Sequence, residues 1–261
     1  MYDSDESSSR RALLGTAAGS LAALAGCTSA LPSMGGSSND GGDTPGGSGS
    51  NGGASSGTSL LYASDETTKF GVDLEGNPLM GSADAPLDVY YWTDYQCPFC
   101  KKFEQDTLPK LVDDYVEPGK LRMVVMENPY IGRASETAAR MSKCVWRTVR
   151  DENPDAFKRW HATVFDEQGK ENSGWANEKN LLEITRGVSG VDAGAVESCM
   201  NEETKAVKAS VDADVRAAES NDIRGTPAFV FFDRESEKAG KIVGAQPYSL
   251  FEKAIRKVDD A

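Results

Sequence analysis

The pattern of hydrophobic and polar residues divides the chain into a part without a core and a part with one. Residues 35–59 consist mainly of Gly and Ser and carry almost no charge. Such a segment buries too little apolar surface to offset the entropy lost when it is ordered. From about Leu60 onward the composition becomes that of a globular protein. We therefore predict a linker over residues 28–59 and a folded domain over residues 60–261.

The first half of the folded domain predicts a strand, a helix and a second strand. Leu87–Trp92 is rich in Val and aromatic residues, which favour strands, and Leu121–Met126 is a second apolar run. Between them, the apolar residues of Lys101–Tyr115 recur on one side of a helix, in which Pro109 predicts a kink. This order and spacing are typical of a βαβ unit.

The second half predicts a helical block followed by two strands and a helix. Residues 133–220 have helical periodicity throughout, with predicted helices at 134–150, from Asn153-Pro154 onward, and at 177–186, 192–200 and 202–220. The remaining predicted elements are strands at 228–232 and 241–243 and a closing helix at 248–258. The pattern as a whole therefore predicts an α/β fold with an all-helical insertion over about residues 133–220.

Cys97-Pro98-Phe99-Cys100 lies where the first predicted strand meets the first predicted helix. A helix N-terminus has free backbone N–H groups and the positive end of the helix dipole, which favour a thiolate over a thiol. This placement is the recognised way to produce a redox-active cysteine. Pro98 suits the first helical position because it needs no N–H partner there. Cys100, one turn later, is placed to attack a mixed disulfide on Cys97.

Two metal-based interpretations of this motif fit the sequence less well. A structural zinc site needs four ligands, and the chain has neither a second CxxC nor more than one His. Attachment of a c-type haem needs His after the second Cys, where the chain has Lys101. The motif therefore predicts redox chemistry at the sulfurs without a metal or another cofactor.

Gly225-Thr226-Pro227 comes immediately before a predicted buried strand. Because Pro cannot donate to a sheet ladder, its position at a strand entry needs a reason. A cis Thr226–Pro227 bond next to the CxxC helix would provide one, since the backbone there can pair with a substrate peptide. An ordinary trans bond is the alternative that base rates favour for an arbitrary X–Pro pair; with the CxxC and the βαβ unit present, we predict cis.

Three separated motifs resemble those of DsbA-like thiol–disulfide oxidoreductases. They are Asp94–Glu104, which contains the CxxC, Gly225–Phe229, and Val243–Pro247. The resemblance covers about residues 71–258 and implies a thioredoxin fold with a helical insertion. It further implies the roles of individual residues: Cys97 as nucleophile, Cys100 as resolving thiol, Pro227 as cis-proline, Thr226 before it, and Glu104 as an acid that tunes the site or relays protons.

Some of these roles have alternatives. Glu104 fits a solvated helical residue as well as it fits a tuning acid. Phe99 can contribute to an apolar substrate patch. The single histidine, His161, fits packing or a surface position better than catalysis. Neither the Pro-Phe dipeptide nor the Thr before Pro227 fixes whether the protein oxidises or reduces its substrates, because potentials in this fold span about 150 mV.

Residues 1–27 are predicted to be an export signal. Arg10-Arg11 precedes the fifteen small and apolar residues 12–26, a length that suits a signal peptide better than a membrane span. The run resembles a twin-arginine signal, and Leu24-Ala25-Gly26-Cys27 resembles a lipobox, which implies a lipid on Cys27. The acidic residues before the arginines depart from the usual positive start, and a plain N-terminal tail is the alternative.

The remaining cysteines, Cys144 and Cys199, both lie in the predicted helical block. In an exported protein they are expected to form a structural disulfide. Two buried free thiols are one alternative, and a second redox-active relay pair is another.

The net charge of −13 argues against nucleic acid as a partner, and one histidine excludes a multi-His metal site within the chain. Acidity spread along the sequence is typical of proteins that stay soluble at high salt, so with the export signal we predict a halophilic archaeal origin; an ordinary acidic domain is the alternative.

We thus predict a lipid-anchored thiol–disulfide oxidoreductase on the outer face of the cytoplasmic membrane. Its partners would be exported proteins that contain cysteine and, in the oxidising direction favoured outside the cytosol, a quinone-linked membrane protein. One alternative is the same fold acting as a reductase or isomerase. Another is a tethered solute- or peptide-binding lipoprotein whose CxxC is only structural.

Overall fold

A computed structural model of the chain describes residues 59–202 and 204–259. Its strands are β1 Leu61–Tyr62, β2 Leu79–Met80, β3 Leu87–Thr93, β4 Leu121–Glu127, β5 Ala228–Asp233 and β6 Ala239–Val243. Its helices are α1 Pro98–Asp106, α2 Leu108–Leu111, the π-helical η1 Val112–Val116, α3 Arg133–Val149, α4 Asp155–Asp166, α5 Glu178–Arg186, α6 Ala193–Glu202, α7 Thr204–Ser220 and α8 Tyr248–Asp259. The predicted α/β fold with a helical insertion is confirmed.

The six strands form one mixed sheet in the order β1-β2-β4-β3-β5-β6. Strands β3 and β4 are parallel and in register from Leu87 and Leu121 to Thr93 and Glu127, as a βαβ unit requires. Strand β5 is antiparallel to β3, with Ala228 opposite Trp92. The end of β3 and the start of β5 therefore lie at the same edge of the sheet. This topology brings the segment after Thr93 and the segment before Ala228 together.

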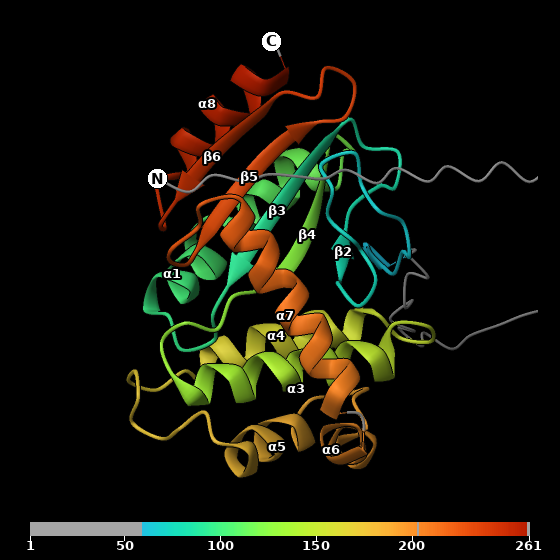
Figure 1. Cartoon of the computed structure of the whole chain (residues 1–261), viewed down its shortest axis with the longest axis vertical. Coiled ribbons are helices and arrows are strands. Elements are labelled where there is room, and N and C mark those ends of the chain that lie inside the picture. Colours follow the sequence, from blue (N-terminus) through green and yellow to red (C-terminus); the bar gives the residue numbers. More distant parts are fainter. Residues whose placement is uncertain (1–58, 203, 260–261) are drawn as a thin grey trace, which may run out of the picture. The chain divides into compact units, whose positions relative to one another are not determined.

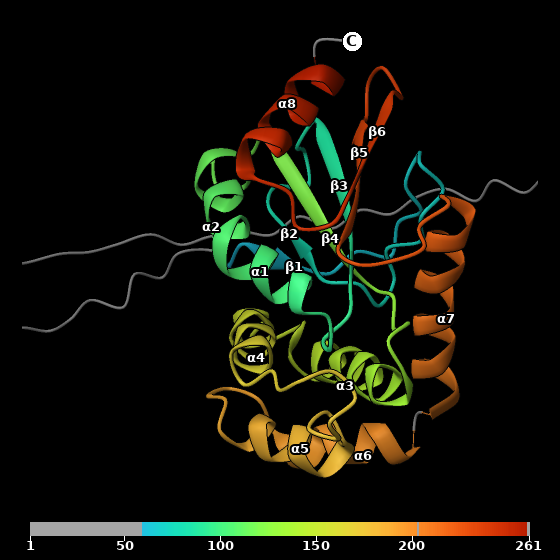
Figure 2. The same cartoon turned by 90° about the vertical axis from the view of Figure 1, so that its left-hand side faces the viewer.

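Helices cover both faces of the sheet, with α1 and α8 on one side and α7 on the other (Figure 2), so alternate residues of each strand pack into different layers. On one face, Phe103 of α1 and Phe251 of α8 both pack against Phe229 of β5, with ring centroids 4.5 and 4.9 Å apart. On the other face, Trp92 of β3 belongs to a second cluster that includes Ala218 of α7. Helices on both faces thus bury the central strands completely.

Helices α3 to α6 of the predicted insertion form a block that packs against the end of the sheet where β3 and β4 end (Figure 1), whereas its last helix, α7, lies on one face of the sheet. A disulfide between Cys144 of α3 and Cys199 of α6 joins two of its helices. A buried ion pair at 2.6 Å joins Lys143 of α3 to Asp214 of α7. The Trp92 indole of β3 donates to the Asp214 carbonyl oxygen at 3.0 Å. The block is therefore anchored to the sheet by polar contacts as well as by apolar packing.

The structure differs from the predicted elements in two places. Strands β1 and β2 were not predicted, because two residues each are too short to show an alternating pattern. The helix predicted over Lys101–Tyr115 is interrupted at Thr107 and continues as α2 and then η1. The break lies just before Pro109, which has no N–H and crowds the carbonyl four residues earlier.

Residues 1–58, with the predicted signal, Cys27 and nearly all of the predicted linker, lie outside the described residues. In the described ranges, no helix combines the length and apolar character that a membrane span requires.

Candidate active site

Cys97 lies at the start of α1. It is the N-cap residue, with extended backbone angles of φ −78° and ψ 117°, and Pro98 is the first helical residue. Strand β3 ends at Thr93, and the turn that follows is closed by the Cys97 N–H, which donates to the Asp94 carbonyl at 2.9 Å. The sulfur of Cys97 is thereby fixed at a helix N-terminus, as the sequence predicts.

The turn before Cys97 is held by residues that sequence reasoning missed. One Asp94 carboxylate oxygen accepts the Gln96 N–H at 2.8 Å, and the other accepts the N–H groups of Tyr130 and Ile131 at 3.1 Å. The Gln168 side chain donates to the carbonyls of Tyr95 and Cys97 at 2.7 and 3.1 Å. Burial raises the pKa of Asp94 despite these bonds. Only the Asp94–Gln96 contact has a local signal, an Asx turn.

The two thiols are free and differ in their surroundings. The pKa of Cys97 is lowered to about 6, mainly by a hydrogen bond from the Cys100 thiol, with further help from the Thr226 side chain and the N–H groups of Cys100 and Phe99, while burial acts against this shift. Burial raises the pKa of Cys100 well above its usual value, and the neighbouring Cys97 adds to the shift. At neutral pH the pair is therefore a Cys97 thiolate beside a protonated Cys100.

The segment before β5 completes the site. The Thr226–Pro227 bond is cis, and the Cys97 thiol donates to the Thr226 carbonyl at 3.3 Å. The Pro227 carbonyl accepts the Gly244 N–H at 2.7 Å, which ties the third motif to the second. The three motifs quoted above thus meet at one edge of the sheet.

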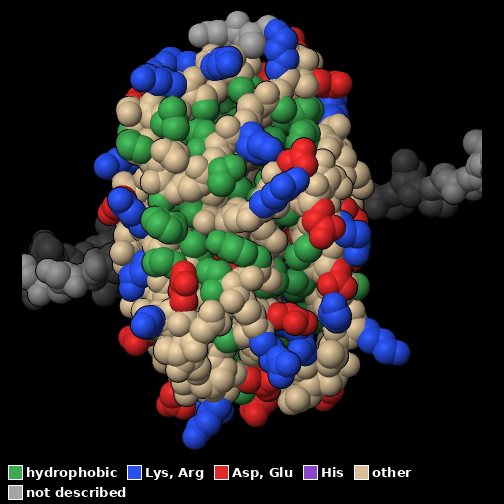
Figure 3. All heavy atoms as spheres, turned by 60° about the vertical axis from the view of Figure 1, so that its left-hand side comes forward, with side chains coloured by type: hydrophobic (Ala, Val, Ile, Leu, Met, Phe, Trp, Pro, Cys, Tyr) green, Lys and Arg blue, Asp and Glu red, His purple; other side chains and the backbone are tan. Residues whose placement is uncertain are grey.

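The entrance to the site is apolar, whereas the sulfurs are enclosed. Phe99 is 61% exposed, but Cys97 is 1% exposed and Cys100 is fully buried. Tyr130, from the loop after β4, is another exposed aromatic residue, and its ring lies near Gly225. Figure 3 shows the side of the molecule that carries α1 and α8, where hydrophobic side chains gather among charged ones. Phe99 and Tyr130 are thus exposed aromatic side chains close to the enclosed sulfurs.

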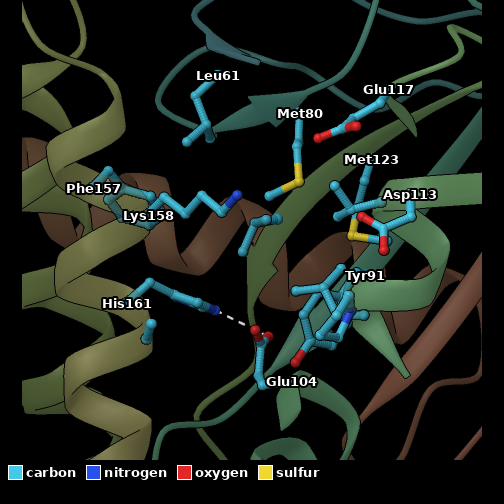
Figure 4. Close-up of a pocket in the computed structure, with 15 residues that line it drawn as sticks. Leu61, Met80, Tyr91, Glu104, Asp113, Glu117, Met123, Phe157, Lys158 and His161 are labelled. Atoms are coloured by element: carbon cyan, nitrogen blue, oxygen red, sulfur yellow. Dashed lines mark hydrogen bonds and ion pairs between the residues drawn. The ribbon is translucent and has the colours of Figure 1, made fainter. Parts of the chain in front are cut away.

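Glu104 and His161 face each other beneath α1 (Figure 4). The Glu104 carboxylate lies 3.0 Å from Nε2 of His161, and both side chains are nearly buried. They line a cavity of about 310 Å³ whose other walls are mostly apolar. The alternatives of a solvated Glu104 and of a surface histidine are therefore wrong: α4 brings His161 into the site from the insertion, a contact across 57 residues that no local pattern reveals.

The other predicted site residues lie apart from this arrangement. The Cys144–Cys199 disulfide is formed and lies within the helical block, which excludes the alternative of two free thiols in this structure. Across residues 59–202 and 204–259, no group of three or more His, Cys, Asp or Glu side chains is arranged to hold a metal ion.

The chain is similar to a disulfide bond formation protein and to two solved structures over most of its folded part. Disulfide bond formation protein D of Bacillus subtilis is 27% identical over 161 residues, which is 62% of this chain and 70% of the relative. The crystal structure of oxidised BdbD from Bacillus subtilis has a TM-score of 0.61 and 24% identity, covering 78% of this chain and all of that one. The structure of α-DsbA1 from Wolbachia pipientis also has a TM-score of 0.61, with 20% identity over 74% of this chain and 96% of that one.

These solved structures show that the fold, with its mixed sheet and helical insertion, is that of a thioredoxin-like protein. The model of the thioredoxin family matches residues 73–248, a range that contains the CxxC, the insertion and the cis-proline. The chain therefore belongs to the thioredoxin family.

Proposed function

We propose that this protein is an extracytoplasmic, membrane-anchored thiol–disulfide oxidoreductase that forms disulfides in exported proteins. The observation that carries the proposal is the state of Cys97: it lies at a helix N-terminus with a pKa of about 6, and the carbonyl before a cis-proline is 3.3 Å from its sulfur. The thiol–disulfide oxidoreductase activity also agrees with the names of its relatives.

In the oxidising direction, a substrate thiolate attacks the Cys97 sulfur of the Cys97–Cys100 disulfide. A mixed disulfide forms, and Cys100 leaves as a thiolate that takes up a proton. A second substrate thiolate then attacks the substrate sulfur of the mixed disulfide and releases Cys97 as a thiolate. The substrate has lost two electrons and gained a disulfide, while the protein holds the dithiol. Stabilisation of the Cys97 thiolate favours this outcome.

The residues around the dithiol have distinct roles in this cycle. The backbone at Thr226 and Pro227 pairs with the substrate polypeptide, and the Thr226 hydroxyl donates to the Cys97 thiolate. Pro98 starts α1 without leaving an N–H unsatisfied. Phe99 contacts apolar residues of the substrate, since its side chain projects from the start of α1. Glu104, four residues after Cys100 on α1, influences how readily Cys100 takes up and releases its proton.

The lipid anchor on Cys27 and the linker over residues 28–59 would hold the domain at the outer face of the membrane. The sequence motifs of residues 1–27 support this part of the proposal. A quinone-linked membrane protein would remove the two electrons from the dithiol and restore the disulfide. Neither step needs a cofactor bound to this chain.

The test is to trap the mixed disulfide. In the Cys100→Ser variant the resolving thiol is missing, so disulfide-linked adducts with exported proteins should accumulate, and Cys97→Ser should form none. If Cys100→Ser accumulates no adducts and both cysteines resist alkylation, the chain is better described as a binding lipoprotein.

The reduction potential of the Cys97–Cys100 pair tests the direction. A thiol pKa of about 6 is below that of thioredoxin, about 7, and above that of DsbA, about 3.5. We therefore expect a potential between the values of about −270 mV and about −120 mV of those two proteins. A potential at or below that of thioredoxin would identify a reductase instead.

A further inference from the structure

The histidine of the helical insertion is bound on both of its ring nitrogens. Nε2 of His161 lies 3.0 Å from the Glu104 carboxylate, and Nδ1 lies 2.7 Å from the Tyr95 hydroxyl. An ionised carboxylate can only accept hydrogen bonds, so the Nε2 atom of His161 carries the proton in its contact with Glu104. Tyr95 is itself fixed by Ser142 of α3, at 3.1 Å, and by the stacked ring of Phe165. Groups from three elements thus determine where the Glu104 carboxylate points.

Two hydroxyl groups act on both this carboxylate's surroundings and those of Cys100. Glu104 lies four residues after Cys100 on α1 and hence on the same side of the helix. The Tyr91 hydroxyl interacts with Glu104 and donates to Oγ1 of Thr93 at 3.0 Å. The Thr93 side chain also acts on Cys100, where it opposes the rise in the thiol pKa that burial causes. The hydroxyl groups of Tyr91 and Thr93 therefore lie in the surroundings that Cys100 and Glu104 share.

Cys100 has to exchange one proton in every catalytic cycle. When it resolves a mixed disulfide, its S–H bond breaks, its sulfur bonds to the Cys97 sulfur, and the Cys97–substrate bond breaks to release a substrate thiolate. Burial makes the Cys100 thiolate unfavourable, and no water reaches its sulfur, which is fully buried. The proton therefore needs an acceptor inside the protein, and it returns from there to solvent.

We propose that His161 is a positioning residue for this step: it holds the Glu104 carboxylate as the acceptor of the Cys100 proton, and the cavity beside the pair passes that proton on to solvent. The cavity of about 310 Å³ has both side chains in its wall (Figure 4). This inference rests on the proposed function. It gives the insertion a part in the chemistry, because α4 supplies the histidine.

Other charged and titratable groups face the pair and have to be considered in any pH profile. Asp113 and Glu117 of η1 and Lys158 of α4 line the same cavity. Tyr91 of β3 and Tyr95 of the following turn contact the pair directly, and the pKa of both phenols is raised well above the usual value by burial. After burial, the charge of Glu127 on β4 is a further cause that raises the pKa of Tyr95.

The experiment follows the resolution step itself. The reduced full chain is mixed with oxidised glutathione, quenched with acid at set times and weighed by intact mass spectrometry. This separates the dithiol, the glutathione adduct on Cys97 and the Cys97–Cys100 disulfide, and Cys97→Ser reports any reaction at other thiols. The variants are Glu104→Gln, His161→Phe, His161→Gln and, as a control for lost packing in α4, Val164→Ala.

We expect His161→Phe and Glu104→Gln to accumulate the glutathione adduct, because general-base help typically contributes about 10²-fold or more and its loss should slow resolution at least about tenfold near neutral pH. The difference in resolution rate between these variants and the wild type should shrink as the pH rises, since Cys100 then ionises without a base. His161→Gln keeps a donor for Glu104 and should recover most of the rate. Adding His161→Phe to Glu104→Gln should slow the reaction no further.

The inference is overturned if His161→Phe resolves the adduct at the wild-type rate, or if Val164→Ala slows resolution equally. It is also overturned if the effects of His161→Phe and Glu104→Gln multiply. The formation of the adduct on Cys97 reports the proposed function separately: it should be unchanged in His161→Phe. If the wild type forms neither the adduct nor the Cys97–Cys100 disulfide, the proposed function is contradicted together with this inference.

Discussion

The acidity of Cys97 depends on groups next to it in sequence and on one 129 residues away. Cys100 and the N–H groups at the start of α1 lower its pKa through local geometry, which any CxxC at a helix N-terminus has. Thr226 contributes from the other side of the site, and its carbonyl is 3.3 Å from the sulfur. Burial of the sulfur opposes them all. The reactive thiol is therefore the result of a balance that a single substitution can shift.

The thiolate of Cys97 should titrate with a midpoint at about pH 6. Thiolate absorbance in the ultraviolet, followed against pH in the reduced protein, measures this directly. Cys100→Ala should raise the midpoint, because the hydrogen bond from the Cys100 thiol makes the largest favourable contribution and alanine has no donor to replace it. Cys97→Ser is the control and should show no titration in this range. A midpoint near the ordinary thiol pKa of about 8.5 would contradict the structure.

At this scale the sequence could identify the residues with a local signature and no others. Cys97, Cys100 and Pro227 stand in short motifs whose chemistry is independent of the rest of the chain. Gln168 and His161 reach the site from the insertion, 71 and 57 residues from their partners. A lone histidine in a helix has the same pattern whether it packs, faces solvent or holds a carboxylate, so its contacts could not be predicted.

At the scale of elements, the disulfide is the covalent link within the helical block. Cys144 and Cys199 lie on α3 and α6 and are separated by 55 residues. Closing a loop of this length limits the freedom of the unfolded chain, so the disulfide should stabilise the fold even though it takes no part in the active site.

Removing this disulfide should lower stability without removing activity. For the Cys144→Ala/Cys199→Ala variant we expect a loss of about 4 kcal/mol in the free energy of unfolding from the chain-entropy relation. Urea unfolding of both proteins, with the Cys97–Cys100 pair held reduced, gives the difference. The rate of adduct formation at Cys97 serves as the control and should stay unchanged. If the double variant is as stable as the wild type but inactive, Cys144 and Cys199 form a redox relay and not a structural disulfide.

The elements themselves were predictable in proportion to their length and burial. Strands β3, β4 and β5 are long and completely buried, and their apolar runs predicted them to within about one residue. Strands β1 and β2 are defined by the pairing of β2 with β4. This tertiary contact has no sequence pattern of its own. Pro109 predicted a disturbance in the first helix, but its outcome, a break at Thr107 and a π-helical turn, depends on packing.

At the scale of the whole molecule, buried polar groups lie where the helical block meets the sheet. Asp214 of α7 pairs with Lys143 of α3 at 2.6 Å and accepts the Glu127 N–H of β4 at 2.9 Å. The Glu127 carboxyl is also buried, and within the described residues its Oε2 has no hydrogen-bond partner. Burial, as the main cause, raises the pKa of Glu127 from 4.5 to about 8, despite the nearby Lys143.

Glu127 should therefore make stability fall as pH rises. Between about pH 4.5 and about pH 8 the unfolded chain ionises Glu127 while the folded chain keeps it protonated, so the unfolded state holds fewer protons. Glu127→Gln should remove this slope and gain about 1.4 kcal/mol over the wild type for each unit of pKa shift. Unfolding in urea at several pH values measures it, with the exposed Glu219→Gln as control. A constant difference between Glu127→Gln and the wild type would show that the carboxyl is ionised in the fold.

The net charge of −13 destabilises the folded molecule through repulsion among like charges, and this destabilisation should depend on the salt concentration. Repulsion among surface carboxylates extends over a Debye length of about 10 Å at 0.1 M salt but only about 3 Å at 1 M. If the protein is adapted to high salt, its thermal midpoint should rise from about 0.1 M to about 3 M KCl, by about 2–4 °C for each kcal/mol of repulsion removed. The triple variant Glu152→Gln/Glu167→Gln/Glu202→Gln removes three exposed acids, so its thermal midpoint should rise less with KCl.

The matched control Lys179→Gln/Lys205→Gln/Lys257→Gln removes three exposed lysines, so its thermal midpoint should rise more with KCl. Midpoints that do not change with KCl in the wild type would mean that the acidity serves solubility alone, because a charge distribution whose repulsion is already balanced at low salt has nothing left for the salt to screen.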